Sequence, residues 1–206
     1  MAIVASAALA AAPQARAQST AKHATFGVIG AVNLTTFGGS DAAGAENKVG
    51  FSAGMFARVP MTEVWSFQPE LEYAMKGAEE TDNSSGTSVK ASVDISYIEM
   101  PLLLRAAAPE SPNGGLYAEF GPALAAKLDC TVSGSGGGLT VSFSCNDAGA
   151  KIKSFDLGAM AGLGYEFPIG RQALSIGVRY NYGLLELASD ANTKNRALQF
   201  LGGFRF

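Results

Sequence analysis

The sequence is poor in the residues on which most enzyme and nucleic-acid-binding sites depend. Its 206 residues include a single histidine, His23, and two cysteines. A Ser-His-Asp triad and a histidine metal cluster both need histidine at their centre, so most hydrolase and metalloenzyme sites lack that part here. Charged residues make up only 16%, with 15 basic against 18 acidic residues. The basic surface that nucleic-acid binding requires is therefore missing as well.

Long apolar runs are also missing. The body of the chain has no uninterrupted apolar segment of about 20 residues, which excludes a helical membrane span. Hydrophobic residues nevertheless make up 48%, with 12 Phe, 6 Tyr and 25 Gly, which excludes a disordered chain. If the protein enters a lipid bilayer, it does so as strands.

The start of the chain has the composition of an export signal. Residues 3–12 are apolar and small, and Pro13 and the A-x-A pattern Ala15-Arg16-Ala17 follow them. We predict a signal peptide over residues 1–17. An N-terminal core helix is the alternative for the same segment.

From Thr25 onward, apolar residues recur at every second position, the period of a strand with one apolar and one polar face. Helical spacing is nowhere sustained. We count eight such segments, whose apolar faces begin near Phe26, Val49, Trp65, Ile98, Leu116, Phe155, Leu174 and Leu198. The pattern predicts an all-β protein.

The connections between these segments alternate in length. Residues 60–64, 107–115 and 168–172 are short connections, whereas residues 36–48, 77–92, 129–153 and 184–195 are long ones. Short turns at one end and long loops at the other are typical of transmembrane barrels. A soluble sandwich or a lipocalin could also give eight alternating strands, so the loops alone leave the choice open.

The second face of the strands discriminates between these folds, because a transmembrane barrel turns its polar residues inward. That face carries six acidic and six basic residues, a balance that lets buried ions pair. They are Arg58, Glu70, Glu72, Lys76, Glu99, Arg105, Glu119, Lys127, Asp156, Glu166, Arg179 and Arg205. We expect Glu70 and Glu72 to neutralise Arg58 and Arg105. A water-facing surface of mixed charge explains the same residues.

Large aromatic residues favour the membrane alternative. They gather at both ends of the strands, as the interfaces of a bilayer require and a soluble sandwich does not. Trp65, Phe67, Tyr165, Phe167, Phe204 and Phe206 lie on the short-turn side, and Phe51, Tyr73, Phe155, Tyr180 and Tyr182 lie near the long loops.

Together these patterns predict an eight-stranded antiparallel up-and-down transmembrane β-barrel with a polar, plugged interior. The barrel domain covers residues 25–206 and follows a short periplasmic segment, residues 18–24. Pro69, Pro101 and Pro122 fall inside proposed strands, where we expect β-bulges. Asp94 and Ser96 share a face with Ile98 and Met100, so either they stand above the bilayer or a bulge resets the register.

Cys130 and Cys145 fall in one long connection on either side of a glycine run. Because an exported protein meets oxidising conditions, we predict a disulfide between them. Residues 131–135 and 139–144 could pair as a hairpin beyond the membrane. No catalytic residue, metal ligand or cofactor is predicted.

The chain resembles the PorT-like outer-membrane β-barrel family. The most specific pieces are residues 66–73 (SFQPELEY) and 97–104 (YIEMPLLL), and residues 116–122 (LYAEFGP) and 162–167 (GLGYEF) continue in family order. The resemblance implies an integral protein of the bacterial outer membrane with periplasmic termini, and it supplies no catalytic residues. The terminal strand ending in Phe206 resembles the signal that the barrel assembly machinery reads.

The function predicted from these features is a structural or interaction role, not catalysis. The long loops, such as the acidic residues 79–86, are the sizeable surface available for adhesion or for docking an extracellular partner. We expect a monomer surrounded by outer-membrane lipid. A narrow channel for small ions is the main alternative, followed by a soluble ligand-binding barrel and a lipid-modifying enzyme.

Overall fold

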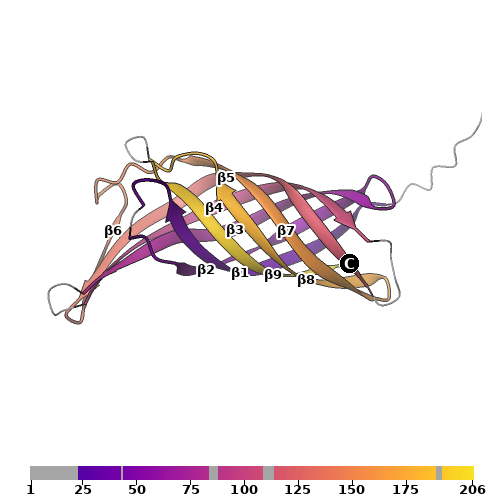
Figure 1. Cartoon of the computed structure of the whole chain (residues 1–206), viewed down its shortest axis with the longest axis horizontal. Helices are drawn as coiled ribbons and strands as arrows, with labels where there is room; N and C mark the ends of the chain where they lie inside the picture. The colour runs from indigo at the N-terminus through magenta and orange to yellow at the C-terminus, as the bar shows by residue number, and fades with distance from the viewer. Residues whose placement is uncertain (1–22, 43, 84–87, 109–113, 189–191) are drawn as a thin grey trace, which may run out of the picture.

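In the computed structural model, antiparallel strands wind around a common axis (Figure 1). The structure describes residues 23–42, 44–83, 88–108, 114–188 and 192–206, so the predicted signal peptide lies outside the described residues. The strands are β1 (Thr25–Gly38), β2 (Lys48–Pro60), β3 (Trp65–Asp82), β4 (Val89–Ala107), β5 (Gly115–Gly136), β6 (Leu139–Ser144), β7 (Phe155–Ile169), β8 (Gln172–Gly183) and β9 (Lys194–Arg205). Within the described ranges, no helix has the length and hydropathy of a membrane span.

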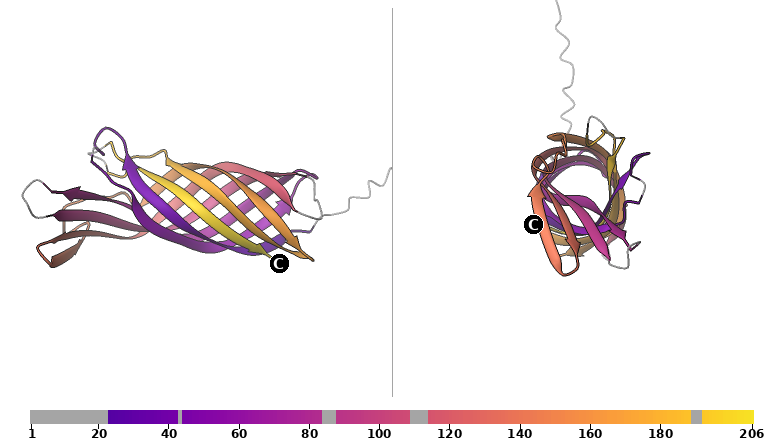
Figure 2. Two further views of the ribbon diagram at one scale, coloured as in Figure 1. Left: turned by 60° about the horizontal axis from the view of Figure 1, so that its bottom comes forward. Right: turned by 90° about the vertical axis from the view of Figure 1, so that its left-hand side faces the viewer.

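Eight of the strands form a closed barrel, which confirms the predicted architecture. The order β4-β3-β2-β1-β9-β8-β7-β5 runs around the wall, and pairing of β4 with β5 closes it. The first strand pairs with the last over the register Gly27↔Arg205 to Gly38↔Lys194. Figure 2 shows the ring of strands viewed along the axis. Eight strands leave an interior just wide enough for side chains to fill.

The wall carries apolar side chains outward and charged side chains inward. Phe67, Leu71 and Val178 are 38%, 50% and 42% exposed. Glu72 and Arg179, on the other face of the same strands, are each 2% exposed. Such a cylinder has an apolar outer band and a polar core, which is the arrangement for hydrocarbon outside and not for water.

Three barrel strands continue past the wall and form a protruding sheet with β6 (Figure 1). This sheet comprises residues 77–82 of β3, 89–95 of β4, 130–136 of β5 and all of β6. The long connections expected at residues 77–92 and 129–153 are therefore wrong in part, because strand pairing runs through much of both. Their Ser and Gly content concealed a second alternation, in which apolar residues recur at every second position, as in Val89, Ala91 and Val93 of β4 and in Leu139, Val141 and Phe143 of β6. The predicted hairpin of residues 131–135 with 139–144 is confirmed.

The polar residues on the outer face of β4 mark the end of the apolar band. Alternation along β4 is unbroken, so Asp94 and Ser96 do share a face with Ile98. Asp94 pairs with Lys48 at 2.7 Å, and the hydroxyls of Ser96 and Tyr73 are 2.8 Å apart. The bulge lies opposite, where the pairing of β4 with β5 shifts register between Ser96 and Tyr97. The face of β4 therefore turns polar here, and the bulge adds one residue to β5 without changing the alternation of β4, so the expected bulge that resets the register of this strand is not found.

The expected bulges at Pro69, Pro101 and Pro122 are not found. The register of strand pairing is the same before and after each proline. Pairing is interrupted at the proline with only one of its two neighbouring strands. On the other side each proline keeps a partner: Pro69↔Leu102, Pro101↔Ala123 and Pro122↔Ala159. A closed wall holds each strand from both sides, so one missing donor opens a short gap without inserting a residue.

The predicted disulfide is confirmed and lies at the base of the β5–β6 hairpin. Cys130 and Cys145 are bonded, with their Cα atoms 5.4 Å apart, and both are buried. The amide of Cys145 also donates to the carbonyl of Cys130 at 2.9 Å. On the chain-entropy account, a cross-link over this separation stabilises the fold by roughly 3 kcal/mol.

A charge placed on the apolar band tests the membrane assignment. Leu163, in the middle of β7, is 69% exposed. In lipid vesicles we expect Leu163→Arg to lower the free energy of unfolding by about 2–4 kcal/mol, because the guanidinium enters hydrocarbon. Chemical unfolding followed by tryptophan fluorescence measures the change.

The matched control is Thr140→Arg on the exposed strand β6 beyond the band, for which we expect a change within about 0.5 kcal/mol. Equal effects of the two substitutions would contradict a lipid-facing band.

Candidate functional site

The centre of the lumen is filled by an ion cluster around Arg179. Its guanidinium donates to Glu70 at 2.8 and 3.0 Å and to Glu119 at 2.9 and 2.7 Å. Glu72 lies 3.5 Å away. Arg179 is on β8 and Glu70 on β3, and three strands separate them in either direction around the wall. The side chain therefore spans the lumen and ties opposite walls together; we call Arg179, Glu70, Glu72 and Glu119 the central ion cluster.

Polar side chains continue toward the long-loop end. Lys76 pairs with Glu99 at 2.6 Å, and Asn181 donates to the same carboxylate at 2.9 Å. One row further, the amide of Asn195 donates to Asp156 at 2.7 Å and to the Tyr97 hydroxyl at 3.1 Å. These contacts give the buried carboxylates partners in a lumen with little room for water.

An apolar cluster covers the lumen above these rows. Ile95, Tyr97, Leu187 and the disulfide are buried together, and Phe37, Val93, Val132, Ala150 and Ile152 pack against them. Next to this cluster lies a pocket of about 300 Å³ lined by Phe37, Val93, Val132, Ile152 and other residues. The long-loop end is thus closed by apolar packing, in addition to the ion cluster at the centre.

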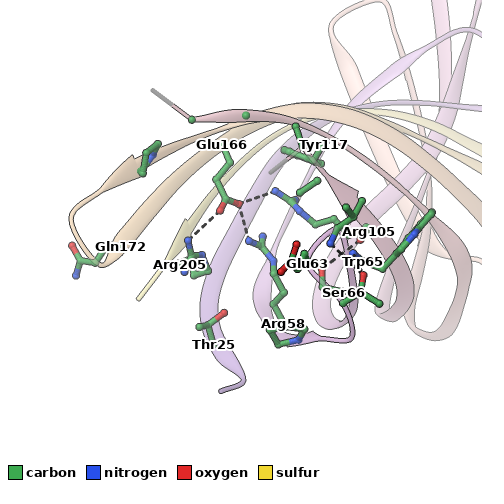
Figure 3. A pocket seen from close by; sticks show the side chains of 18 of the residues that line it. Thr25, Arg58, Glu63, Trp65, Ser66, Arg105, Tyr117, Glu166, Gln172 and Arg205 are labelled. Carbon is green, nitrogen blue, oxygen red and sulfur yellow. Dashed lines mark hydrogen bonds and ion pairs between the residues drawn. The ribbon is translucent and has the colours of Figure 1, made fainter. Parts of the chain in front are cut away.

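At the short-turn end, three arginines converge on one carboxylate (Figure 3). Arg58 and Arg105 donate to one oxygen of Glu166 at 2.8 and 2.7 Å, and Arg205 donates to the other at 3.2 Å. The guanidinium of Arg105 also lies 3.3 Å from the ring centroid of Tyr117. Stacking of this kind holds the guanidinium plane in place.

Two bridges join the short-turn arginines to the central ion cluster. Gln68 accepts from Arg58 at 2.9 Å and donates to Glu70 at 2.7 Å. Arg105 lies 3.5 Å from Glu119. The charges form one connected network, with three acids around one arginine at the centre and three arginines around one acid at the mouth.

The structure places the twelve charged residues predicted for the second face on the inner side of the wall, but it pairs some of them differently from expectation. Glu70 and Glu72 contact Arg179, so the expected neutralisation of Arg58 and Arg105 by these two acids is wrong. The tilt of the strands brings Arg58 and Arg105 to the level of Glu166 instead. Lys127 donates to the carbonyl of Ile152 at 2.7 Å, and no acid pairs with it in the described part of the chain.

Sequence reasoning missed the uncharged members of this network. Gln68, Asn181, Asn195 and Tyr97 are buried and bond to the charged residues. Gln68, Asn181 and Tyr97 each lie two residues along the strand from a predicted inward charge, and Asn195 has the same parity as Arg205 on β9. Their position on the inward-facing side of the alternating pattern was the signal that could have revealed them.

The predicted interface aromatics lie on the outer surface of the wall at its two ends. Most are exposed, whereas Tyr73, Tyr165 and Phe204 are half-buried. Neighbours contact one another: the ring centroids are 5.8 Å apart in Phe51–Tyr73, 4.7 Å in Tyr165–Phe167 and 5.6 Å in Phe204–Phe206. Among the described residues, no three His, Cys, Asp or Glu side chains are arranged to hold a metal ion.

The chain was compared with protein families, with curated proteins and with solved structures. A family model described as an outer membrane protein beta-barrel domain matches residues 16–189, which span β1 to β8. Among solved structures, the chain is similar to Neisserial surface protein A at 16% identity and a TM-score of 0.49, covering 89% of this chain and 98% of that one. It is similar to OprG of Pseudomonas aeruginosa at 12% identity and a TM-score of 0.46, with 89% and 94% covered. Ail of Yersinia pestis gives 13% identity and a TM-score of 0.43, with 89% and 99% covered. No curated protein sequence matches the chain.

Removing Arg179 tests whether the central ion cluster holds the walls together. We expect Arg179→Ala to lower the free energy of unfolding by about 3–5 kcal/mol, because it leaves buried carboxylates without a counter-charge. The triple variant Arg179→Met, Glu70→Gln, Glu119→Gln should recover part of that loss, since it also removes two of the charges.

Urea unfolding in micelles measures both, with Arg171→Ala in the exposed β7–β8 turn as the control expected to stay within about 0.5 kcal/mol. A loss in the triple variant as large as in Arg179→Ala would contradict this account.

Proposed function

The chain belongs to the family of proteins with an outer membrane protein beta-barrel domain, and from this premise we propose that it is an interaction protein whose protruding sheet docks a protein partner outside the cell. In this proposal the long-loop end faces outward and both termini lie in the periplasm. The length asymmetry of the connections supports that orientation, since barrels of this membrane carry their longer loops outside.

The observation that carries the proposal is an apolar face on the protruding sheet, over whose outer part no described residue packs. Val93, Val132 and Phe143 pair side by side across β4, β5 and β6, and Val141 and Leu139 continue the same face along β6. Leu139, Val141 and Phe143 are 77%, 56% and 57% exposed. An apolar surface of this kind in water is typical of a protein-binding site.

The opposite face of the sheet is polar. Lys90 and Ser92 alternate with the valines of β4, and the hydroxyls of Ser133 and Ser142 are 2.9 Å apart across β5 and β6. The protruding sheet therefore reverses the arrangement of the barrel wall. Its polar face continues the outer surface of the wall, and its apolar face is turned toward the barrel axis.

The edge of the sheet and its charges indicate the chemistry of the partner. Among the described strands β6 pairs with β5 alone, so its other edge offers free backbone donors and acceptors for an added strand. Asp41 and Glu80 line the pocket that adjoins the apolar face, and no Lys or Arg is among its described lining residues. Glu79 also lines this pocket, but Lys90 neutralises it at 2.7 Å. We propose that the partner is an extended protein segment in which apolar and cationic residues alternate.

Other parts of the proposal rest on the sequence. Residues 66–73 and 97–104, in the parts of β3 and β4 that belong to the barrel wall, support a relationship to the PorT-like branch of the family. The terminal aromatic residue Phe206, whose amide donates to Phe26 on the first strand at 2.9 Å, supports recognition of the last strand by the barrel assembly machinery. The aromatic rings at both ends of the wall support a role at the two bilayer interfaces.

A narrow ion channel is the second candidate, favoured by the charged lining of the lumen. The central ion cluster and the apolar cluster above it both oppose conduction. In planar bilayers we therefore expect a silent wild-type protein.

Arg179→Ala, checked for folding by its heat-modifiable gel mobility, should raise the frequency of brief conductance steps, because it removes the side chain that spans the lumen. Steady conductance of the wild type would favour the channel over the docking role.

Docking to the apolar face can be tested with a peptide of alternating Val and Lys binding to the nanodisc-embedded protein, measured by interferometry. We expect Val141→Asn with Phe143→Asn to weaken binding at least tenfold. Thr140→Asn with Ser142→Asn, on the polar face of the same strand, should change it less than twofold.

A peptide of alternating Val and Glu should bind at least tenfold more weakly than the Lys peptide. Equal binding of the two peptides, or equal effects of the two double variants, would remove the docking proposal.

A further inference from the structure

A cavity of about 850 Å³ opens at the short-turn end of the barrel, away from the protruding sheet. Figure 3 shows side chains that line it. Its wall includes Arg58 from β2, Arg105 from β4, Glu166 from β7 and Arg205 from β9. We call this cavity the short-turn vestibule. The docking role proposed above makes no use of it.

The vestibule concentrates positive charge. Arg171 also lines it, so four arginines share the described lining with two acids, Glu63 and Glu166. Three of the arginines are bonded to the single carboxylate of Glu166 at 2.7 to 3.2 Å. The single charge of Glu166 balances only one of the three guanidinium groups. The next acid toward the centre of the lumen, Glu119, lies 3.5 Å from Arg105 and also pairs with Arg179.

The three arginines differ in how far the cavity reaches them. The side chain of Arg105 is 3% exposed and stacks on Tyr117, so it is fixed in the wall. The side chains of Arg58 and Arg205 are 12% and 18% exposed, and Glu166 between them is 20% exposed. Two partly exposed arginine side chains therefore flank a carboxylate that is itself open to the cavity.

This arrangement suits an oxyanion in addition to, or in place of, the carboxylate. A guanidinium fork matches two oxygens of a phosphate group, and charge-assisted bonds of this kind are the strong ones. Glu166 already places two oxygens among the three arginines in the way that a bound anion would. It thus acts as a built-in competitor for the same donors.

We propose that the short-turn vestibule binds a small multivalent phosphate-type oxyanion through Arg58 and Arg205, and that Glu166 limits the affinity. Such a group can come from a soluble phosphate compound or from a lipid headgroup at the rim. Binding of either kind is independent of the orientation of the barrel and of the protruding sheet.

The test uses the full chain in maltoside micelles, titrated calorimetrically with pyrophosphate at constant ionic strength. We expect one site per chain. Glu166→Gln should tighten binding at least tenfold by removing the competing charge, whereas Arg205→Gln should weaken it at least tenfold. Lys90→Gln, which changes an exposed lysine of the protruding sheet, is the control and should alter the affinity less than twofold.

Two further measurements keep the result decisive. If Arg205→Gln loses its heat-modifiable mobility, Arg58→Lys replaces it, because lysine keeps the charge but loses the fork, and binding should weaken three- to tenfold. Phosphatidylglycerol added to the micelles identifies the source: if it displaces pyrophosphate at low mole fraction, the headgroup is the occupant. Absence of binding by both phosphate compounds, or unchanged affinity in Glu166→Gln, would overturn the proposal.

Discussion

The closure of the backbone ladder is the constraint on which the rest of this structure depends. Hydrocarbon offers no hydrogen-bond partners, so every strand in the wall must be paired on both sides, and β1 with β9 and β4 with β5 complete the ring. A ring of eight strands is too narrow for bulk water, which means that polar groups turned inward must satisfy one another. The network from Glu166 through Arg105 and Glu119 to Arg179 is the consequence. The same closure lets Pro69, Pro101 and Pro122 interrupt the ladder without shifting its register.

Charge is balanced over this network but not at each point along the axis. The centre carries Arg179 with three glutamates, and the mouth carries Glu166 with three arginines. The central surplus is buried and held by bonds that span the lumen. The surplus at the mouth borders an open cavity, where solutes can reach it. One network thus closes the lumen at its centre and presents partly exposed arginine side chains at one end.

Strands β3, β4 and β5 each run through two surroundings, the lipid-facing wall and the protruding sheet in water. In the barrel wall, from Tyr97 to the short turn, β4 turns its charged residues inward and large apolar residues outward. In the protruding sheet the arrangement is reversed: Val89 and Val93 lie on the inner face, and Lys90 and Ser92 lie on the outer face. An outer face that becomes polar has left the hydrocarbon. The inner face, where it becomes apolar, first packs over the lumen. It then extends along β6, where no residue of the described ranges covers it. The apolar packing over the lumen and the surface that we propose for docking are consecutive parts of one apolar stripe.

Local alternation by itself determined the number of strands in the barrel wall, the faces of their side chains and the class of fold, because the period of two depends only on backbone geometry. The sequence also predicted the disulfide, because Cys130 and Cys145 are the two cysteines of a chain expected to be exported to oxidising conditions. Only the tertiary structure decided which ions meet: Arg179 and Glu70 are 109 residues apart in sequence and on opposite walls, and the tilt and stagger of the strands set their common level. The length of β3, β4 and β5 beyond the band was likewise decided by pairing between strands, which stabilises Ser- and Gly-rich segments that a single segment's composition assigns to loops.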